Sequence, residues 1–163
     1  MSGTVGQVVV KSIGVDHLGA VDAVMVAAFD PAFGEAWNSA QVLATLAMPG
    51  YRLRGAFVGP DEGELAGFAI TRIVAGESEL LLLAVDPEHR RRGAASALMR
   101  DWFLICEDRG VEMAFLEMRE DNPARFLYEA FGFVAAAVRK SYYRGADGIV
   151  RNAVTMKRSL MPL

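Results

Sequence analysis

The sequence is poor in the residues that build disulfide scaffolds and zinc centres. Its 163 residues include one cysteine, Cys106, and two histidines, His17 and His89. A single thiol cannot form an internal disulfide, and one cysteine with two distant histidines supplies too few ligands for a zinc cluster. The composition therefore excludes a disulfide scaffold, and we expect no metal site.

Long apolar runs and an excess of positive charge are also missing. No apolar stretch reaches the roughly 18 residues that cross a bilayer, and the N-terminal MSGTVGQ has neither the basic flank nor the apolar core of a signal peptide. Lys and Arg number 17 against 20 Asp and Glu, so the net charge is −3. Such a chain offers no overall field for nucleic acid or anionic lipid. We expect a cytoplasmic protein with neither partner, and the composition leaves its oligomeric state open.

What is present indicates a globular protein. Hydrophobic residues make up 53% of the chain and charged residues 23%, which excludes disordered and collagen-like classes. A chain of this length buries roughly 68–70% of its unfolded surface, so its core needs no disulfide or metal ion for stability. Because the sequence contains no internal repeat and no Ser/Pro-rich linker, we expect one domain over residues 1–163.

Hydrophobic periodicity predicts seven strands and four helices. The strands are expected at 7–13, 52–58, 65–74, 79–85, 111–118, 133–142 and 149–157. The helices are expected at 16–28, 38–47, 93–109 and 122–131, with N-caps at Asp16, at Asn38 or Ser39, and at Asn122. Strand 79–85 is almost wholly apolar, so we expect it to be central and buried on both faces. The element order predicts a mixed sheet covered by helices, in the α/β or α+β class.

Three consecutive arginines, residues 90–92, precede the third predicted helix and are followed by Gly93. A helix N-terminus is the positive end of the macrodipole, so each cation there costs a few tenths to about 1 kcal/mol unless an anion compensates. Free N–H groups at a glycine-containing turn bind phosphate or pyrophosphate, and guanidinium groups strengthen such a site. The alternative is that the arginines extend into water or pair with Asp86 and Glu88. The segment lacks the GxxxxGK of a P-loop and the GxGxxG of a dinucleotide fold.

The spacing of this turn and of the segments after it resembles one enzyme family. Arg90-x-x-Gly93-x-Ala95 fits the signature Q/R-x-x-G-x-G/A of the GCN5-related N-acetyltransferase (GNAT) superfamily. FLEMREDNPARFLYEAFGF, RKSYY and DGIVRNAVTM continue the similarity in order and spacing. Within the superfamily, the pattern is most similar to enzymes that acetylate the N-terminal alanine of a ribosomal protein. The resemblance implies a mostly antiparallel sheet with splayed central strands, flanked by helices, and acetyl-CoA as the cofactor.

The resemblance also implies which residues hold coenzyme A. The backbone of the apolar strand would pair with the pantetheine arm like an additional strand, through Leu83, Ala84 and Val85. The N–H groups of the arginine turn would bind the pyrophosphate, through Arg91, Arg92, Gly93, Ala94, Ala95 and Ser96. Asn122 would bind farther along the pantetheine.

Direct acetyl transfer to an amine requires a base and an acid. Glu117 has the same strand parity as the apolar Met113 and Phe115, so partial burial would raise its pKa from about 4.3 toward the working range of a base. The alternative is a solvated strand end. Tyr128 has the spacing of a core aromatic, although a phenol with a pKa near 10 can also protonate a thiolate. The resemblance implies Glu117 as the base and Tyr128 as the acid.

An α-amino group is the acceptor that suits a carboxylate base. Its pKa is near 8 against about 10.4 for lysine, so neutralising it at pH 7 costs about 3 kcal/mol less. The resemblance implies a ribosomal protein N-terminus as the partner, lying between residues 31–37 and the RKSYY hairpin. Trp37, Tyr142 and Tyr143 are candidates for lining that groove, unless they are ordinary packing aromatics. Two other functions stay open: acetylation of a small amine or lysine side chain, and a non-catalytic coenzyme A sensor.

Overall fold

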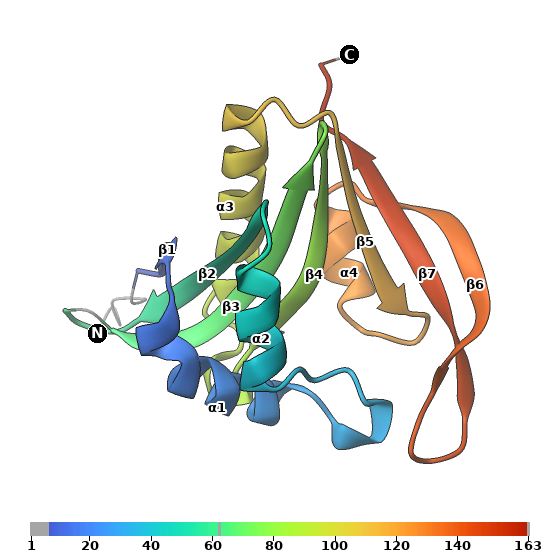
Figure 1. Cartoon of the computed structure of the whole chain (residues 1–163), viewed down its shortest axis with the longest axis horizontal. Coiled ribbons are helices and arrows are strands. Elements are labelled where there is room, and N and C mark those ends of the chain that lie inside the picture. The colour runs from blue at the N-terminus through green and yellow to red at the C-terminus, as the bar shows by residue number, and fades with distance from the viewer. Residues whose placement is uncertain (1–6, 62, 163) are drawn as a thin grey trace, which may run out of the picture.

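The computed structural model describes residues 7–61 and 63–162, which form one seven-stranded sheet (Figure 1). The strand order is β1-β2-β3-β4-β5-β7-β6, and all neighbours are antiparallel except the parallel pair β4 and β5. The strands are β1 (Val9–Ser12), β2 (Tyr51–Val58), β3 (Glu64–Val74), β4 (Glu77–Val85), β5 (Met113–Arg119), β6 (Val134–Arg144) and β7 (Val150–Ser159). This confirms the predicted mixed, mostly antiparallel sheet.

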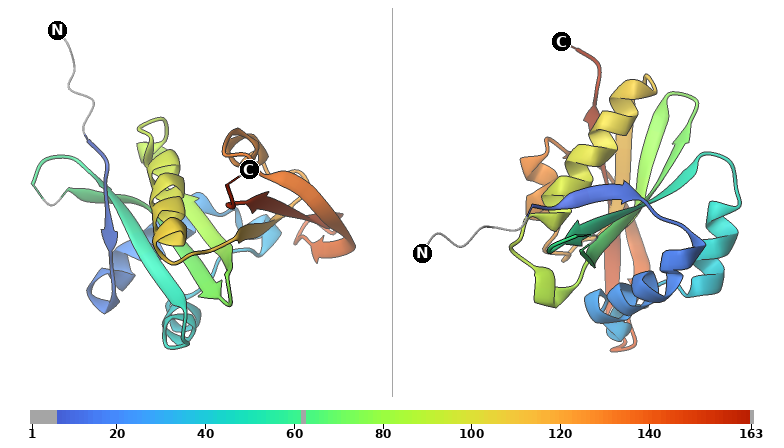
Figure 2. Two further views of the ribbon diagram at one scale, coloured as in Figure 1. Left: turned by 90° about the horizontal axis from the view of Figure 1, so that it is seen from above. Right: turned by 90° about the vertical axis from the view of Figure 1, so that its left-hand side faces the viewer.

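Helices cover both faces of the sheet (Figures 1 and 2). The helix α2 begins with a capping box, in which Asn38 accepts the N–H of Gln41 and the Gln41 side chain accepts the N–H of Asn38, each at 2.8 Å. None of the described helices is long and apolar enough to span a bilayer. The helices are α1 (Leu18–Ala28), α2 (Ser39–Leu46), α3 (Ala94–Asp108) and α4 (Arg125–Ala130), with short 3₁₀ turns η1 (Val15–His17), η2 (Pro31–Phe33) and η3 (Pro87–His89).

Two predicted N-caps are wrong. Asp16 lies inside the turn η1, so α1 begins two residues later and its N-cap position, His17, makes no side-chain hydrogen bond. Asn122 accepts the N–H of Ala124 at 2.9 Å, but α4 begins only after that turn. In both cases a tight turn uses the polar residue before the helix starts, which spacing alone does not reveal. The N-terminal residues 1–6, used above to predict the compartment, lie outside the described residues.

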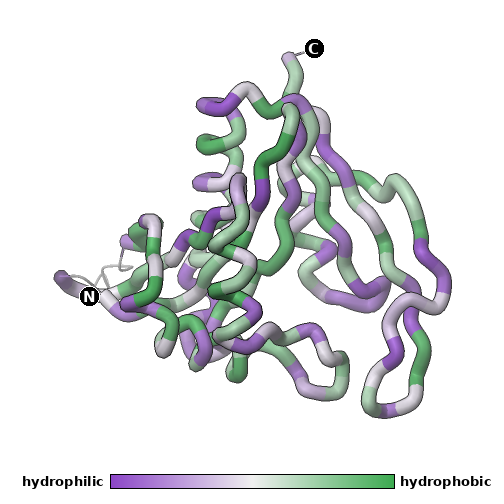
Figure 3. The backbone as a smooth tube through the Cα atoms, in the orientation of Figure 1, coloured by the Kyte–Doolittle hydropathy of each residue, from purple (hydrophilic) through white to green (hydrophobic). Residues whose placement is uncertain are grey.

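The sheet separates two hydrophobic cores. The first lies under α3 and α4 and contains Trp102, whose indole N–H donates to the Ser78 hydroxyl at 2.8 Å. The second lies under α1 and α2 and contains Phe68 and Met25. Figure 3 shows hydrophobic and hydrophilic residues alternating along the strands and helices, as expected for elements with one face on a core.

The strands β4 and β5 part after a short stretch of pairing. They pair only over Glu77–Leu80 and Met113–Leu116, after which β4 pairs with β3 alone and β5 with β7 alone. Ile70 opposes Leu82 while Thr71 opposes Leu80, so Leu81 is an extra residue in β4. Such a bulge bends a strand and increases its twist. The predicted splay of the central strands is confirmed.

The prediction that β4 is buried on both faces is wrong at its C-terminal end. Leu82 and Ala84 are buried in the second core, but Leu83 and Val85 are only half-buried. Both side chains pack against the first core with part of their surface and line a cavity with the rest. The apolar residues at this end of β4 therefore line a cavity as well as a core.

The close approach of β3 to β4 gives a test of this arrangement. A Cβ added at Gly67 would lie 2.6 Å from the carbonyl oxygen of Ala84, a backbone atom that cannot move without shifting β4. Gly67→Ala is expected to lower the free energy of unfolding by about 1–3 kcal/mol, measured by urea denaturation. Gly19→Ala on α1, where nothing lies within 4 Å, is the control and is expected to be neutral or slightly stabilising. Equal midpoints for Gly67→Ala and the wild type would contradict this account.

Candidate active site

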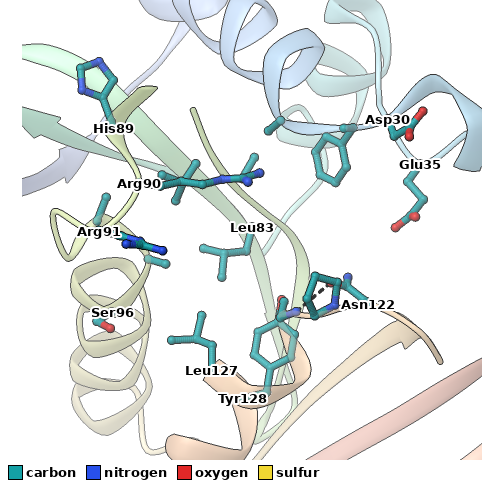
Figure 4. A pocket seen from close by; sticks show the side chains of 18 of the residues that line it. Asp30, Glu35, Leu83, His89, Arg90, Arg91, Ser96, Asn122, Leu127 and Tyr128 are labelled. Atoms are coloured by element: carbon teal, nitrogen blue, oxygen red, sulfur yellow. Dashed lines mark hydrogen bonds between the residues drawn. The ribbon is translucent and has the colours of Figure 1, made fainter. Parts of the chain in front are cut away.

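A cavity of about 690 Å³ lies where β4 and β5 part (Figure 4). Five segments that are distant in the sequence line it: the end of α1 with the loop after it, the end of β4, the turn before α3, the end of β5, and the start of α4. The lining residues are Ala28, Phe29, Asp30, Phe33, Glu35, Leu83, Ala84, Val85, His89, Arg90, Arg91, Gly93, Ala94, Ala95, Ser96, Arg119, Asn122, Pro123, Ala124, Leu127 and Tyr128.

One wall of the cavity is an open strand edge. Past Leu80, no described strand pairs with β4 on the side that faces β5. The free N–H and C=O groups of Leu83–Val85 can therefore form strand-like hydrogen bonds with an extended ligand. The sequence-predicted residues Leu83, Ala84 and Val85 all line the cavity.

The turn before α3 offers a row of free N–H groups. Arg91 and Gly93 both have left-handed backbone conformations, with φ of 66° and 81°. Within the described part of the chain, no N–H from residues 91–96 donates a backbone hydrogen bond outside the helix, and the first N–H groups of a helix have no acceptor inside it. With the helix dipole behind them, these groups suit an anion.

The arginines of this turn differ in position. Arg90 and Arg91 line the cavity, whereas Arg92 is exposed and lies outside the lining. The expected alternative partners do not hold them: among the described residues, neither Asp86 nor Glu88 forms an ion pair with any of the three. Asp86 instead accepts the N–H of Glu88 at 2.9 Å. Two guanidinium groups are thus available to a ligand in the cavity.

Tyr128 lies deep in the cavity at the start of α4. Its side chain is 7% exposed and its ring meets Phe133 edge-on at 6.3 Å. Burial, and then the negative charge of Glu35, raise the pKa of the Tyr128 phenol to about 12. The phenol therefore keeps its proton throughout the neutral pH range. The spacing of Tyr128 predicts a core aromatic, and its side chain is buried in the first core. The same side chain also lines the cavity, as a role for it at the cofactor requires.

Glu117 lies outside this cavity. Its side chain is 20% exposed and forms an ion pair with Arg139 at 2.9 Å. It lines a second hollow, of about 450 Å³, that also contains Arg72, Glu79 and Thr155. The structure therefore places the predicted base and the predicted acid in two separate hollows, which share no lining residue.

The predicted acceptor aromatics occupy three different environments. Trp37 packs half-buried against the second core and does not line the cavity. Tyr142 is 51% exposed, with the Arg139 guanidinium 4.5 Å from its ring centroid. Tyr143 is half-buried, and burial together with the carboxylates of Glu35 and Glu117 raises the pKa of its phenol to about 12. None of the three lines the cavity, and Tyr143 is the one whose phenol is influenced by the charges of Glu35 and Arg119.

A bulge in β6 precedes Tyr143. Arg139 opposes Ala153 and Tyr143 opposes Arg151, so β6 carries two extra residues between these pairs. Ser141, within the bulge, has a φ of 56°, a conformation that non-glycine residues seldom adopt. The Ser141 N–H is held by the side chain of Asn152 at 2.9 Å.

Sequence reasoning missed a cluster at the end of β5. The buried Arg119 forms ion pairs with Glu35 and Asp121, and its guanidinium lies 3.5 Å from the centroid of the Phe33 ring. Burial raises the pKa of Glu35 above its usual value, an effect that Arg119 offsets only in part. The acidic and aromatic residues of PAFGEAW were the only feature of the sequence that pointed to this cluster. The sequence alone gives no reason to expect that loop to contact Arg119.

Comparison with known proteins places this geometry in a family. A sequence model described as "Acetyltransferase (GNAT) family" matches residues 23–133. The chain belongs to the GNAT family of acetyltransferases. The family predicted from the arginine turn is thereby confirmed.

Curated relatives of this GNAT chain include two named [ribosomal protein bS18]-alanine N-acetyltransferase. The one from Escherichia coli K12 is 42% identical over 87 residues, which cover 53% of this chain and 59% of the relative. The one from Haemophilus influenzae is 36% identical over 96 residues, covering 59% of this chain and 66% of the relative. The chain thus matches about three fifths of the length of these relatives.

Solved structures match over nearly the whole chain. The crystal structure of the ribosomal-protein-S18-alanine N-acetyltransferase from Escherichia coli has a TM-score of 0.82 at 30% identity and covers 96% of both chains. The structure of Ard1 from Thermoplasma volcanium has a TM-score of 0.79 at 25% identity, covering 95% of this chain and 99% of that one. The GNAT fold therefore extends beyond the region matched by the family model.

The site fits acetyl-CoA, the acyl donor of GNAT acetyltransferases. The open edge of β4 presents amide groups that match those of an extended pantetheine arm. The free N–H groups of residues 91–96, together with Arg90 and Arg91, match the charge of a pyrophosphate.

Because Arg91 lines the cavity and Arg92 does not, their substitutions are expected to affect coenzyme A binding differently. Arg91→Ala is expected to raise the Kd for coenzyme A roughly 10-fold, because it removes a charge-assisted contact at the turn. Arg92→Ala is expected to have a smaller effect, since that side chain lies outside the cavity. Arg100→Ala, on the exposed face of α3, controls for the loss of one positive charge. Isothermal titration calorimetry measures all three, and equal losses in Arg91→Ala and Arg92→Ala would contradict the assignment.

Proposed function

We propose that this chain transfers the acetyl group of acetyl-CoA directly to the N-terminal α-amine of a ribosomal protein, within a ternary complex. The observation that carries the proposal is the parting of β4 and β5, which gathers an open strand edge, an anion-binding turn and a buried phenol around one cavity. The similarity to enzymes named for the N-terminal alanine of bS18 supports the choice of acceptor.

The proposal assigns the donor to residues on three elements. The edge of Leu83–Val85 binds the pantetheine arm, and the N–H groups of residues 91–96 with Arg90 and Arg91 bind the pyrophosphate. The Asn122 oxygen already accepts the N–H of Ala124 at 2.9 Å, which leaves the Asn122 amide N–H groups for the pantetheine. Bound in this way, acetyl-CoA supplies an activated acetyl carbonyl group.

Glu117 then acts as the general base and Tyr128 as the general acid. The C–N bond to the acceptor forms as the C–S bond of the thioester breaks, so the amine must lose a proton and the sulfur must gain one. Glu117 accepts the proton of the amine through water, because it lies in a hollow that shares no lining residue with the cavity of Tyr128. Tyr128, which keeps its proton to about pH 12, donates to the sulfur.

The acceptor approaches between the η2 loop and the β6–β7 hairpin. These segments are tied together by the N–H of Ala146, which donates to the carbonyl of Ala32 at 2.7 Å. Tyr143 and the hollow beside Glu117 contact the residues that follow the acceptor's amine. Trp37 packs against the second core and steadies the loop, and the exposed Tyr142 contacts the chain farther out.

Acetylation of defined acceptors tests the function. The chain is incubated with acetyl-CoA and a peptide bearing the N-terminal alanine of bS18, and the products are mapped by mass spectrometry. The expected result is one acetyl group on the α-amine and none on an otherwise identical peptide with a formylated N-terminus. Acetylation of spermidine or of a lysine side chain alone would overturn the ribosomal acceptor. Coenzyme A binding with no acetylated product would instead indicate a sensor.

Substitution of the phenol tests the role of Tyr128. Because general acid catalysis contributes roughly 10²- to 10⁴-fold, Tyr128→Phe is expected to lower kcat by at least about 100-fold with little change in the Kd for acetyl-CoA. The acid is active only while protonated, and its pKa is raised to about 12. The wild-type kcat should therefore show no decline from about pH 8 to about pH 10, where an unshifted phenol would begin to ionise. A decline centred near pH 10, or an unchanged kcat in Tyr128→Phe, would contradict the assignment.

A further inference from the structure

The two partners of Glu117, the proposed base, contact the same carboxylate oxygen. Arg139 Nη2 lies 2.9 Å from Glu117 Oε2, and the Thr155 hydroxyl donates to Oε2 over a longer distance of 3.5 Å. Within the part of the chain that the structure describes, no donor contacts the other oxygen, Oε1. Each carboxylate oxygen has about two lone pairs, so Oε1 keeps its capacity to accept a proton. The carboxylate is therefore anchored through one oxygen and free at the other.

Arg139 reaches Glu117 across an intervening strand. The strand β7 lies between β5, which carries Glu117, and β6, which carries Arg139 (Figure 1). Glu117 is opposite Thr155 on β7, and Arg139 is opposite Ala153, which is two residues away from Thr155 on the same face. Because the side chain of Ala153 is small, the long side chain of Arg139 can extend over it to the carboxylate. Glu117 and Arg139 both line the second hollow.

Arg139 is itself supported by an aromatic ring. Its guanidinium carbon lies 4.5 Å from the centroid of the Tyr142 ring, within the range of a cation–π contact. Tyr142 belongs to the bulge of β6 that follows Arg139, and the N–H of Ser141 in this bulge is bound by the side chain of Asn152 at 2.9 Å. The side chain of Arg139 is 61% exposed, yet it contacts a ring on one side and the carboxylate of the base on the other.

The ion pair of Arg139 with Glu117 is better placed to affect chemistry than stability. Ion pairs with an exposed partner usually add little to the free energy of unfolding. The other ion pair of this hollow, Arg72 with Glu79 at 3.0 Å, joins the neighbouring strands β3 and β4 and does not involve the base. A general base, by contrast, works only when its accepting atom is held in a productive geometry. Arg139 contacts that base directly.

We propose that Arg139 is a positioning residue for Glu117, whose Oε2 it anchors so that Oε1 stays free to receive the proton of the acceptor's amine. The proton passes from the amine through water to Oε1. The amine nitrogen bonds to the acetyl carbon, the C–S bond breaks, and Tyr128 gives its proton to the sulfur. Arg139 keeps its own protons throughout and acts only through the base. This inference rests on the proposed function, in which Glu117 is the base.

Steady-state kinetics with acetyl-CoA and a peptide bearing the N-terminal alanine of bS18 test the proposal. Arg139→Gln is expected to lower kcat by about 10-fold or more with little change in KM, because the base loses its orientation while both substrates still bind. Arg139→Lys keeps a positive charge near Oε2 and is expected to recover most of this loss. The urea midpoint of Arg139→Gln and its Kd for coenzyme A should match those of the wild type, which separates positioning from a defect in folding.

A double-mutant cycle shows whether Arg139 acts through Glu117. Glu117→Gln alone is expected to lower kcat by roughly 10²- to 10⁴-fold, since it removes the base. When Arg139→Gln is added to Glu117→Gln, kcat is expected to fall no further, because the residue that Arg139 positions is already lost. Arg100→Gln, which removes one positive charge from the exposed face of α3, is the matched control and should leave kcat unchanged.

Several results would overturn the inference while the proposed function stands. These are an unchanged kcat in Arg139→Gln, a higher KM at constant kcat, which would make Arg139 a contact of the acceptor, equal losses in Arg139→Lys and Arg139→Gln, and additive losses in the double variant.

Failure of the proposed function gives different results. If Glu117→Gln keeps the kcat of the wild type, Glu117 is not the base, and the inference falls with that assignment. If the wild type acetylates spermidine or a lysine side chain but no α-amine, the proposed acceptor is wrong. The same cycle is then run with the amine that is acetylated, and its outcome decides the role of Arg139 independently of the acceptor.

Discussion

The parting of β4 from β5 is the constraint on which the rest of the site depends. The extra residue Leu81 in β4 bends the strand away after four paired positions. A paired edge would have no free backbone groups, and a fully covered β4 would leave no cavity. The same divergence leaves Leu83 and Val85 only partly buried against the first core and lets Tyr128 on α4 line the cavity. A local bulge thus creates the donor cavity, its open edge and the access of the phenol to it.

The second constraint is electrostatic and joins distant segments. Arg119 at the end of β5 pairs with the α1–α2 loop through Glu35 and with the following turn through Asp121. Phe33 lies between Arg119 and Arg151, with guanidinium carbons 3.5 and 4.8 Å from its ring centroid. These contacts tie the α1–α2 loop to β5 and β7.

Particular elements show where prediction from the sequence succeeded. The arginine turn and Gly93 line the cavity, and their binding of an anion stays a prediction that rests on the free N–H groups of a helix N-terminus. The element order and the family followed from periodicity and motif spacing. The caps at Asp16 and Asn122 were predicted wrongly, since the choice between a tight turn and a helix start depends on contacts that the local sequence does not contain. The ion pair of Glu35 with Arg119 was missed for the same reason, since the two residues are 84 positions apart.

The sequence by itself determined the order of strands and helices and the family, because each depends on residues close together in the chain. Only the tertiary structure decided which arginines line the cavity, that Glu117 and Tyr128 occupy separate hollows, and that Glu35 pairs with Arg119. Those properties arise from strand divergence and from ion pairs between distant segments, where the direction of a side chain is set by its neighbours in space.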